Sequence, residues 1–136
     1  WPYVQHRGGP TGFVRVLDEK TLGFADFRGN RQYVSVGNVT TDDRVSLFFM
    51  DYPNRARLKL YGRATLIGGD DKETLAKLEL SDYRARVERG FLIYIEAFDW
   101  NCPQHIAQRY TLAEIEEATV PLRARIAELE ALVAKK

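Results

Sequence analysis

The sequence predicts a small α+β protein that is mainly β and is built as an antiparallel barrel. At least five segments have the composition of β-strands and are separated by turn residues, a pattern typical of small β-barrels. Most successive strands have no helix between them, although a parallel nucleotide-binding fold would require one. The 136 residues fit a single domain, 1–136, with one hydrophobic core.

The expected strands alternate apolar and polar residues, except for one that is almost wholly apolar. That exception, RVSLFFM at 44–50, is typical of a strand buried on both faces. In the long segment 56–68, Leu58 and Leu60 share one face, while Arg57 and Lys59 share the other. The expected strands are 13–17, 22–26, 44–50, 56–68 and 90–100, with an extended segment at 2–7.

Three helices are expected, at 31–39, 70–80 and 111–136. The first is short and crosses between strands, and Gly37 weakens it. The second has Asp70 three residues before Glu73, which is the spacing of a capping box.

The carboxy-terminal helical segment, 111–136, has a similar capping box at Thr111–Glu114. Pro121 is expected to break this helix or to begin a new one. Beyond it, apolar residues recur at four–three–four spacing, which predicts a packing stripe. They are Leu122, Ile126, Leu129 and Val133.

The balance of charge excludes several classes of partner. With 20 basic and 19 acidic residues, the chain has no net field that would attract nucleic acid or a membrane surface. No apolar run approaches the roughly 20 residues of a spanning helix. The single cysteine, Cys102, excludes an internal disulfide and makes a reducing cytoplasm the expected location.

Standard catalytic and metal-binding motifs are absent from the sequence. His6 and His105 lack the carboxylate or cysteine spacing of a metal site, so we expect no metal and identify no catalytic residue. There is no G-x-G-x-x-G fingerprint and no phosphate loop of the Walker type. Any chemistry is therefore expected to come from a bound cofactor.

One short segment, between an expected strand and the first expected helix, has the features of a phosphate-binding site. Asn30, Arg31 and Gln32 stand at the beginning of the first expected helix, where unpaired backbone amides and the helix dipole favour an anion. An arginine in a first turn opposes that dipole unless an anion lies in front of it. The alternative interpretation is a turn followed by a capped helix, and the residues alone leave both open.

A longer stretch resembles a known family. The run WPYVQHRGGP…LGFADFRGNRQYVSVGNVTTDDRVSLFFMDYPNRARLKLYGRATL, within residues 1–68, is similar to the flavin-binding core of the pyridoxamine 5′-phosphate oxidase family. These proteins are FMN-binding split β-barrels. The strand at 90–100 matches less distinctly, and WNCPQHIAQRY at 100–110 resembles a subgroup without the oxidase's established activity. Because the family has one more strand before WPYVQ, we expect a preceding strand to be missing.

The resemblance implies roles for particular residues. It places Gln5, His6 and Arg7 along the flavin and Asp26 at its side, with the phosphate at Asn30, Arg31 and Gln32. It places Arg57 near the pyrimidine end of the ring, where a cation would stabilise reduced flavin, with Lys59 on the same strand face. Trp100 would flank the flavin from the neighbouring subunit or, alternatively, cap the end of the barrel. These cofactor-binding assignments comprise Gln5, His6, Arg7, Asp26, Asn30, Arg31, Gln32, Arg57, Lys59 and Trp100.

The implied function is that of a homodimeric flavin-dependent oxidoreductase, with FMN at the subunit interface and a small-molecule redox substrate. The helix at 111–136 replaces the segment that holds the substrate phosphate in the oxidase, so the resemblance does not carry over the oxidase's substrate. Two alternatives remain open. The barrel could bind flavin without turnover, or the same pocket could hold a deazaflavin or haem.

Overall fold

The computed structural model describes residues 2–29, 33–81, 83, 85–100 and 102–134. Two compact units are present, and we consider each by itself. The first contains residues 1–49 and 58–100, and the second contains residues 50–57 and 101–136.

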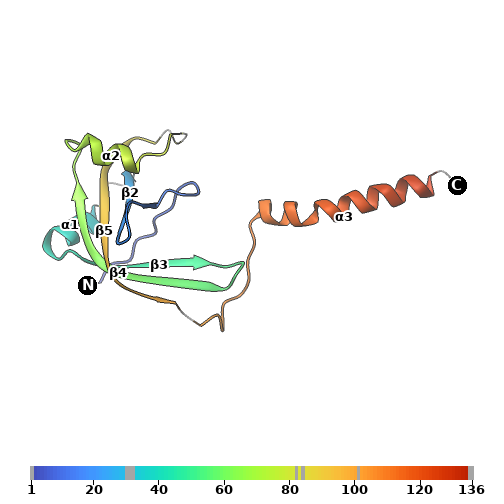
Figure 1. Cartoon of the computed structure of the whole chain (residues 1–136), viewed down its shortest axis with the longest axis horizontal. Helices are drawn as coiled ribbons and strands as arrows, with labels where there is room; N and C mark the ends of the chain where they lie inside the picture. The colour runs from blue at the N-terminus through green and yellow to red at the C-terminus, as the bar shows by residue number, and fades with distance from the viewer. Residues whose placement is uncertain (1, 30–32, 82, 84, 101, 135–136) are drawn as a thin grey trace. The chain divides into compact units, whose positions relative to one another are not determined.

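Five antiparallel strands form one sheet in the order β1-β2-β5-β4-β3 (Figure 1). The strands are β1 (Arg15–Val16), β2 (Thr21–Phe27), β3 (Arg44–Asp51), β4 (Ala56–Ile67) and β5 (Val87–Trp100). β5 lies in the centre because it pairs with β2 on one side and with β4 on the other. The α+β class is confirmed, whereas the described strands leave β1 and β3 as edges and do not close a barrel.

The core of the first unit lies where β2, β5 and β4 run side by side. Phe24 and Phe91 are direct cross-strand partners, and their rings stack with centroids 5.1 Å apart. Cross-strand aromatic pairs of this kind stabilise a sheet beyond their buried area. The buried cluster consists of Leu22, Phe24, Leu60, Ala64, Phe91 and Ile93.

Helix α2 (Lys72–Leu78) packs against the sheet through two buried leucines, Leu75 and Leu78. Leu78 is completely buried, and its methyl groups lie over Gly23 of β2 and Gly90 of β5. A Cβ at either glycine would come within 2.5 or 2.6 Å of this side chain. The two glycines therefore allow the helix to approach the sheet this closely.

One expected strand and the expected extended segment differ from their predictions. Residues 44–50 do form β3, but its side chains alternate between exposed and half-buried, because β3 is an edge strand and is not buried on both faces. Residues 2–7, which we expect to be extended, form no described strand.

Helix α2 begins later than predicted. Asp71, rather than Asp70, caps α2, since its carboxylate accepts a hydrogen bond from the Thr74 amide at 3.0 Å; this bond lowers the pKa of Asp71. Helix α1 spans Val34–Thr41 and has no buried residue. The start of the expected 31–39 helix lies outside the described residues.

Helix α3 (Leu112–Val133) belongs to the second unit. The predicted capping box is confirmed, since Thr111 and Glu114 exchange side-chain-to-backbone hydrogen bonds of 2.7 and 3.3 Å. The prediction that the helix breaks or restarts at Pro121 is wrong, because α3 continues through this residue. Proline has no N–H, so the Glu117 carbonyl loses its usual helical donor there while the rest of the helix remains intact.

We predict that Leu78→Ala lowers the free energy of unfolding by about 2–5 kcal/mol, because it leaves a cavity between α2 and the sheet. Urea unfolding followed by circular dichroism measures this change. Val16→Ala is the control, since Val16 is 77% exposed and its truncation should cost less than about 0.5 kcal/mol. Equal effects of the two substitutions would contradict the packing described here.

Candidate functional site

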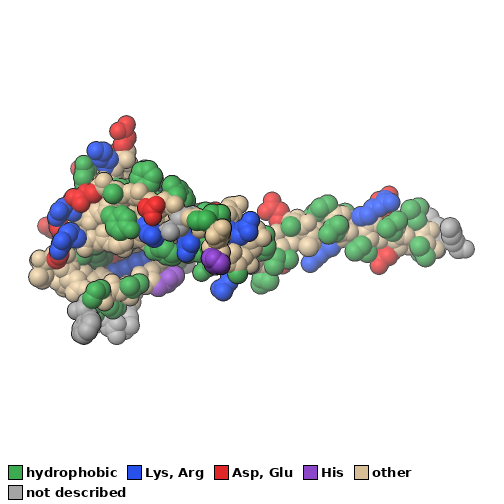
Figure 2. All heavy atoms as spheres, turned by 90° about the horizontal axis from the view of Figure 1, so that it is seen from below, with side chains coloured by type: hydrophobic (Ala, Val, Ile, Leu, Met, Phe, Trp, Pro, Cys, Tyr) green, Lys and Arg blue, Asp and Glu red, His purple; other side chains and the backbone are tan. Residues whose placement is uncertain are grey.

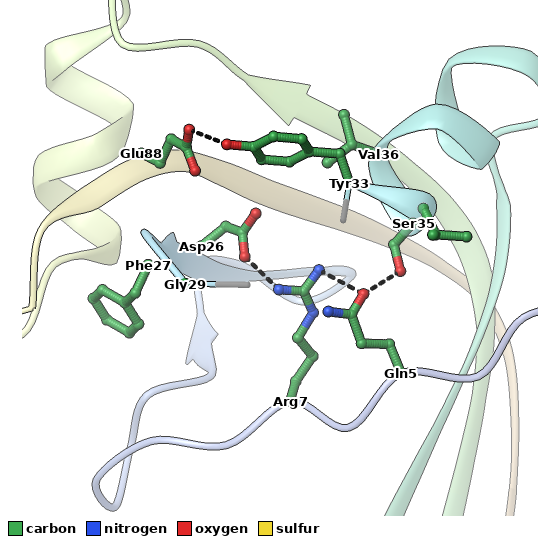
Figure 3. Close-up of a pocket in the computed structure, with 10 residues that line it drawn as sticks. Gln5, Arg7, Asp26, Phe27, Gly29, Tyr33, Ser35, Val36 and Glu88 are labelled. Carbon is green, nitrogen blue, oxygen red and sulfur yellow. Dashed lines mark hydrogen bonds and ion pairs between the residues drawn. The ribbon is translucent and has the colours of Figure 1, made fainter. Parts of the chain in front are cut away.

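A small polar hollow of about 160 Å³ lies in the first unit between the amino-terminal segment, the end of β2 and the start of α1 (Figure 3). This volume is below the roughly 300–1,000 Å³ of typical small-molecule sites, so these residues alone would enclose only part of a larger ligand. The lining residues are Gln5, Arg7, Asp26, Phe27, Gly29, Tyr33, Val34, Ser35, Val36 and Glu88.

Asp26 is the buried charge of this site, with 8% of its surface exposed. The Arg7 guanidinium donates a hydrogen bond to one carboxylate oxygen, and the Arg89 Nε lies 3.6 Å from the other. The register of the sheet explains the second contact, because Asp26 and Arg89 are direct partners on β2 and β5. A buried carboxylate requires such compensation, which two guanidinium groups supply here.

Aromatic rings and an amide network hold Arg7 in place. Its guanidinium lies 5.1 Å from the centre of the Phe91 ring and 5.7 Å from that of Phe24, within cation–π range. The same group donates to Gln5 Oε1 at 3.3 Å, and the Ser35 hydroxyl donates to that oxygen at 2.5 Å (Figure 3). Gln5 thus links the amino-terminal segment to the first turn of α1.

Tyr33 precedes α1 in a left-handed backbone conformation, with φ of 50°. This conformation is unusual for a bulky side chain and needs support from its surroundings. The Tyr33 hydroxyl donates to Glu88 Oε1 at 2.8 Å, and the Arg89 guanidinium lies 4.6 Å from the centre of the tyrosine ring. These contacts position the start of α1 against β5.

The described charges around the hollow are balanced. Arg7 and Arg89 face Asp26, and Arg89 also pairs with Glu88 at 3.2 Å. Two cations and two carboxylates leave no surplus positive charge among these four residues. A dianionic phosphate in this place would therefore need a further cation.

The structure brings together three of the expected site residues, Gln5, Arg7 and Asp26. His6 is exposed, and its ring lies against Gly8 rather than among the lining residues. The expected phosphate residues, Asn30, Arg31 and Gln32, lie outside the described residues. Gly29 and Tyr33, which flank them, both line the hollow.

Three other expected residues are not among those that line the hollow. Arg57 donates to the Cys102 carbonyl oxygen at 3.1 Å within the second unit. Lys59 pairs with Asp99 at 3.5 Å, and Trp100 is 61% exposed.

Sequence reasoning missed Tyr33, Ser35, Glu88 and Arg89. The last two were missed because the final strand was expected to begin at residue 90, whereas β5 begins at Val87. The charged residues just before the apolar run at 90–100 are one signal that the strand begins earlier than predicted. Ser35 and Tyr33 had no separate signal, since their roles depend on where α1 meets β2 and β5.

Within the described part of the chain, no group of three or more His, Cys, Asp or Glu residues is arranged to hold a metal ion. No described helix is both long and apolar enough to cross a membrane.

The fold and the site together define the class: an antiparallel α+β protein with a small polar hollow beside its first helix. The family model of pyridoxamine 5′-phosphate oxidase matches residues 1–106, and the chain belongs to this family. All residues that line the hollow fall within the matched segment.

Solved structures with a similar fold include HupZ from Group A Streptococcus. That chain is 17% identical, with a TM-score of 0.52 and coverage of 75% of this chain and 78% of HupZ. A histidine-to-alanine variant of HupZ gives the same identity and TM-score, with coverage of 68% and 76%. A protein of unknown function from Agrobacterium tumefaciens is 23% identical over 74% of this chain and 45% of its own, with a TM-score of 0.42. A search of the curated proteins found no match.

We predict that Asp26→Asn lowers the free energy of unfolding by about 1–3 kcal/mol, because Arg7 and Arg89 lose the carboxylate between them. Asp43→Asn is the matched control. Asp43 pairs with Arg63 at 2.8 Å, but both side chains are nearly half exposed, so this loss should stay below about 1 kcal/mol. Urea titration of both variants measures the two losses of stability. A smaller loss for Asp26→Asn than for Asp43→Asn would contradict the prediction that the Asp26 carboxylate stabilises the fold.

Proposed function

We propose that this protein binds FMN in the hollow beside α1 and acts as a flavin-dependent oxidoreductase. The observation that carries the proposal is the Gln5–Arg7–Asp26 cluster, which combines donors and acceptors at a hollow inside the family-matched segment. Bound FMN would supply the hydride-accepting ring that the chain's own side chains lack.

The polar groups of the hollow suit the edge of a flavin ring. Arg7 and Ser35 carry donors, while Asp26 and Gln5 carry acceptors, and the pyrimidine portion of the ring needs both. The existing network would have to exchange some of its internal hydrogen bonds for bonds to the ligand. The chain's contribution would be to bind and orient the ring and to adjust its electronics.

The balance of charge supports Arg31 as the phosphate partner. Because Arg7, Arg89, Asp26 and Glu88 compensate one another, they offer no free cation for a phosphate. Arg31 lies between Gly29 and Tyr33 in the sequence, and both of these line the hollow. We place the phosphate there, with support from Asn30 and Gln32.

We further propose a homodimeric split barrel in which a second chain covers the flavin. Support comes from large aromatic side chains on β4 and β5 that are exposed in the single chain, since exposed apolar patches commonly mark interfaces. Tyr61 is 42% exposed and Tyr94 49%, and the register of β4 with β5 puts both on one face of the sheet.

The second candidate function is binding of flavin without catalytic turnover. In the third, the protein binds haem or a deazaflavin in place of FMN. Haem iron takes a histidine, cysteine, methionine or, less often, a tyrosine as an axial ligand. Among the described residues that line the hollow, Tyr33 alone is of these types, and its hydroxyl donates to Glu88 Oε1. The absorption spectrum of the purified protein separates flavin from haem and from deazaflavin. Reduction of bound FMN by a hydride donor, followed by reoxidation, then separates turnover from simple binding.

We predict that Arg31→Ala weakens FMN binding roughly 10- to 150-fold, because one charge-assisted hydrogen bond of about 1.5–3 kcal/mol is lost. Fluorescence titration measures both dissociation constants. Riboflavin, which has no phosphate, should bind the wild type and the variant almost equally.

Arg44→Ala is the control for this experiment, since Arg44 is an exposed arginine that pairs with Asp42. Its FMN affinity should equal that of the wild type. An unchanged FMN affinity in Arg31→Ala would reject Arg31 as the phosphate partner. Failure of the wild type to bind any flavin would reject the proposed function itself.

A further inference from the structure

The exposed face of α3 carries a regular heptad pattern. Assigning position a to Leu112 places Leu112, Thr119, Ile126 and Val133 at a, and Ile115, Leu122 and Leu129 at d. Six of these seven residues are apolar, so the stripe runs along the whole helix. This 3.5-residue repeat is the pattern by which helices pair side by side.

No described residue of α3 is buried, and Figure 2 shows its hydrophobic side chains on the surface among charged ones. Leu122 is 63% exposed, Ile126 54% and Val133 73%. Near the end of the helix, Ile126, Leu129 and Val133 line a shallow groove. Apolar side chains arranged in this way lose free energy when a partner helix removes them from water.

The residue types favour two parallel strands. The first heptad has the reverse pattern, with Leu112 at a and Ile115 at d. In the rest of the helix the a positions hold Thr119, Ile126 and Val133, which are all β-branched, and Leu122 and Leu129 occupy d. β-Branched residues at a with leucine at d favour parallel dimers over trimers and tetramers. Pro121 falls at position c, outside the seam, where its ring does not interrupt the contact.

The flanking charges match a second copy of this helix. In a parallel pair, position g of one helix faces position e of the other five residues further on. This places Arg125 at g opposite Glu130 at e, twice by symmetry. An antiparallel pair centred on the same stripe would instead oppose Glu116 with Glu130, and Arg123 with itself.

We propose that α3 associates with α3 of a second copy of this chain as a parallel two-stranded coiled coil. The seam consists of the heptad a and d residues from Leu112 to Val133, and Arg125–Glu130 pairs set its orientation. This inference does not depend on flavin binding. It also involves a surface different from the aromatic side chains of β4 and β5.

Disulfide trapping tests the proposal on the full chain. Val133→Cys places a thiol at the end of the seam, in a Cys102→Ala background because Cys102 is exposed. Mild oxidation should give a crosslinked dimer on a non-reducing gel, since only a parallel, in-register pair brings position 133 next to its counterpart. Absence of this crosslink overturns the proposal, even if another surface keeps the chain dimeric.

Paired variants show whether the seam itself produces the crosslink. Adding Leu122→Glu and Leu129→Glu buries charge at two d positions and should reduce the crosslinking rate at least about tenfold. Adding Ala124→Glu and Ala131→Glu is the matched control, because it places the same charges seven residues apart at the outward f positions. Equal rates in the two sets overturn the proposal.

A charge exchange tests the orientation separately. A homodimer of the Arg125→Glu variant places two glutamates opposite each other at positions 125 and 130. A homodimer of the Glu130→Arg variant places two arginines there. Mixing the two restores attraction at both sites. We expect the mixed crosslink to exceed either self-crosslink severalfold, as measured by mass spectrometry, and a statistical mixture overturns the assigned Arg125–Glu130 contact.

Discussion

The candidate site depends on how one buried carboxylate is compensated. Asp26 lies at the end of β2 between Arg7 and Arg89, and its position on the sheet follows from the pairing of β2 with β5. Without these guanidinium groups, the charge would carry a large desolvation cost. The same arrangement brings the amino-terminal segment onto the sheet, so stability and the shape of the hollow have one origin.

The remainder of the first unit keeps this arrangement rigid. Phe24 and Phe91 stack beneath the Arg7 guanidinium, while Tyr33 joins α1 to β5 through Glu88 and Arg89. The close approach of α2 through Leu78 buries the same two strands. One side of the hollow is therefore formed by the packed strands β2 and β5, and the other by the amino-terminal segment and α1. The second unit, with α3, presents a different type of surface, whose apolar residues have no described cover.

Membership of the pyridoxamine 5′-phosphate oxidase family and the geometry of the hollow bear on function in different ways. The family model covers the segment that contains the whole hollow. The geometry adds that the described charges compensate one another, so a phosphate must find its cation elsewhere. This combination directs the proposal for FMN to the joint between Gly29 and Tyr33, rather than to the most evident arginine of the hollow.

The sequence by itself determined the α+β class, most strand positions and the capping box of α3, because alternation and capping are local patterns. A resemblance carried by local motifs also selected Gln5, Arg7 and Asp26 as site residues, and the structure brings these three together at one hollow. Only the tertiary structure decided that β3 is an edge strand, that Asp71 caps α2 and that Pro121 lies within a continuous helix. The contacts of Asp26 with Arg89 and of Tyr33 with Glu88 join residues more than 50 positions apart. Such contacts follow from the pairing register of β2 with β5 and from the packing of α1, which periodicity along the chain does not specify.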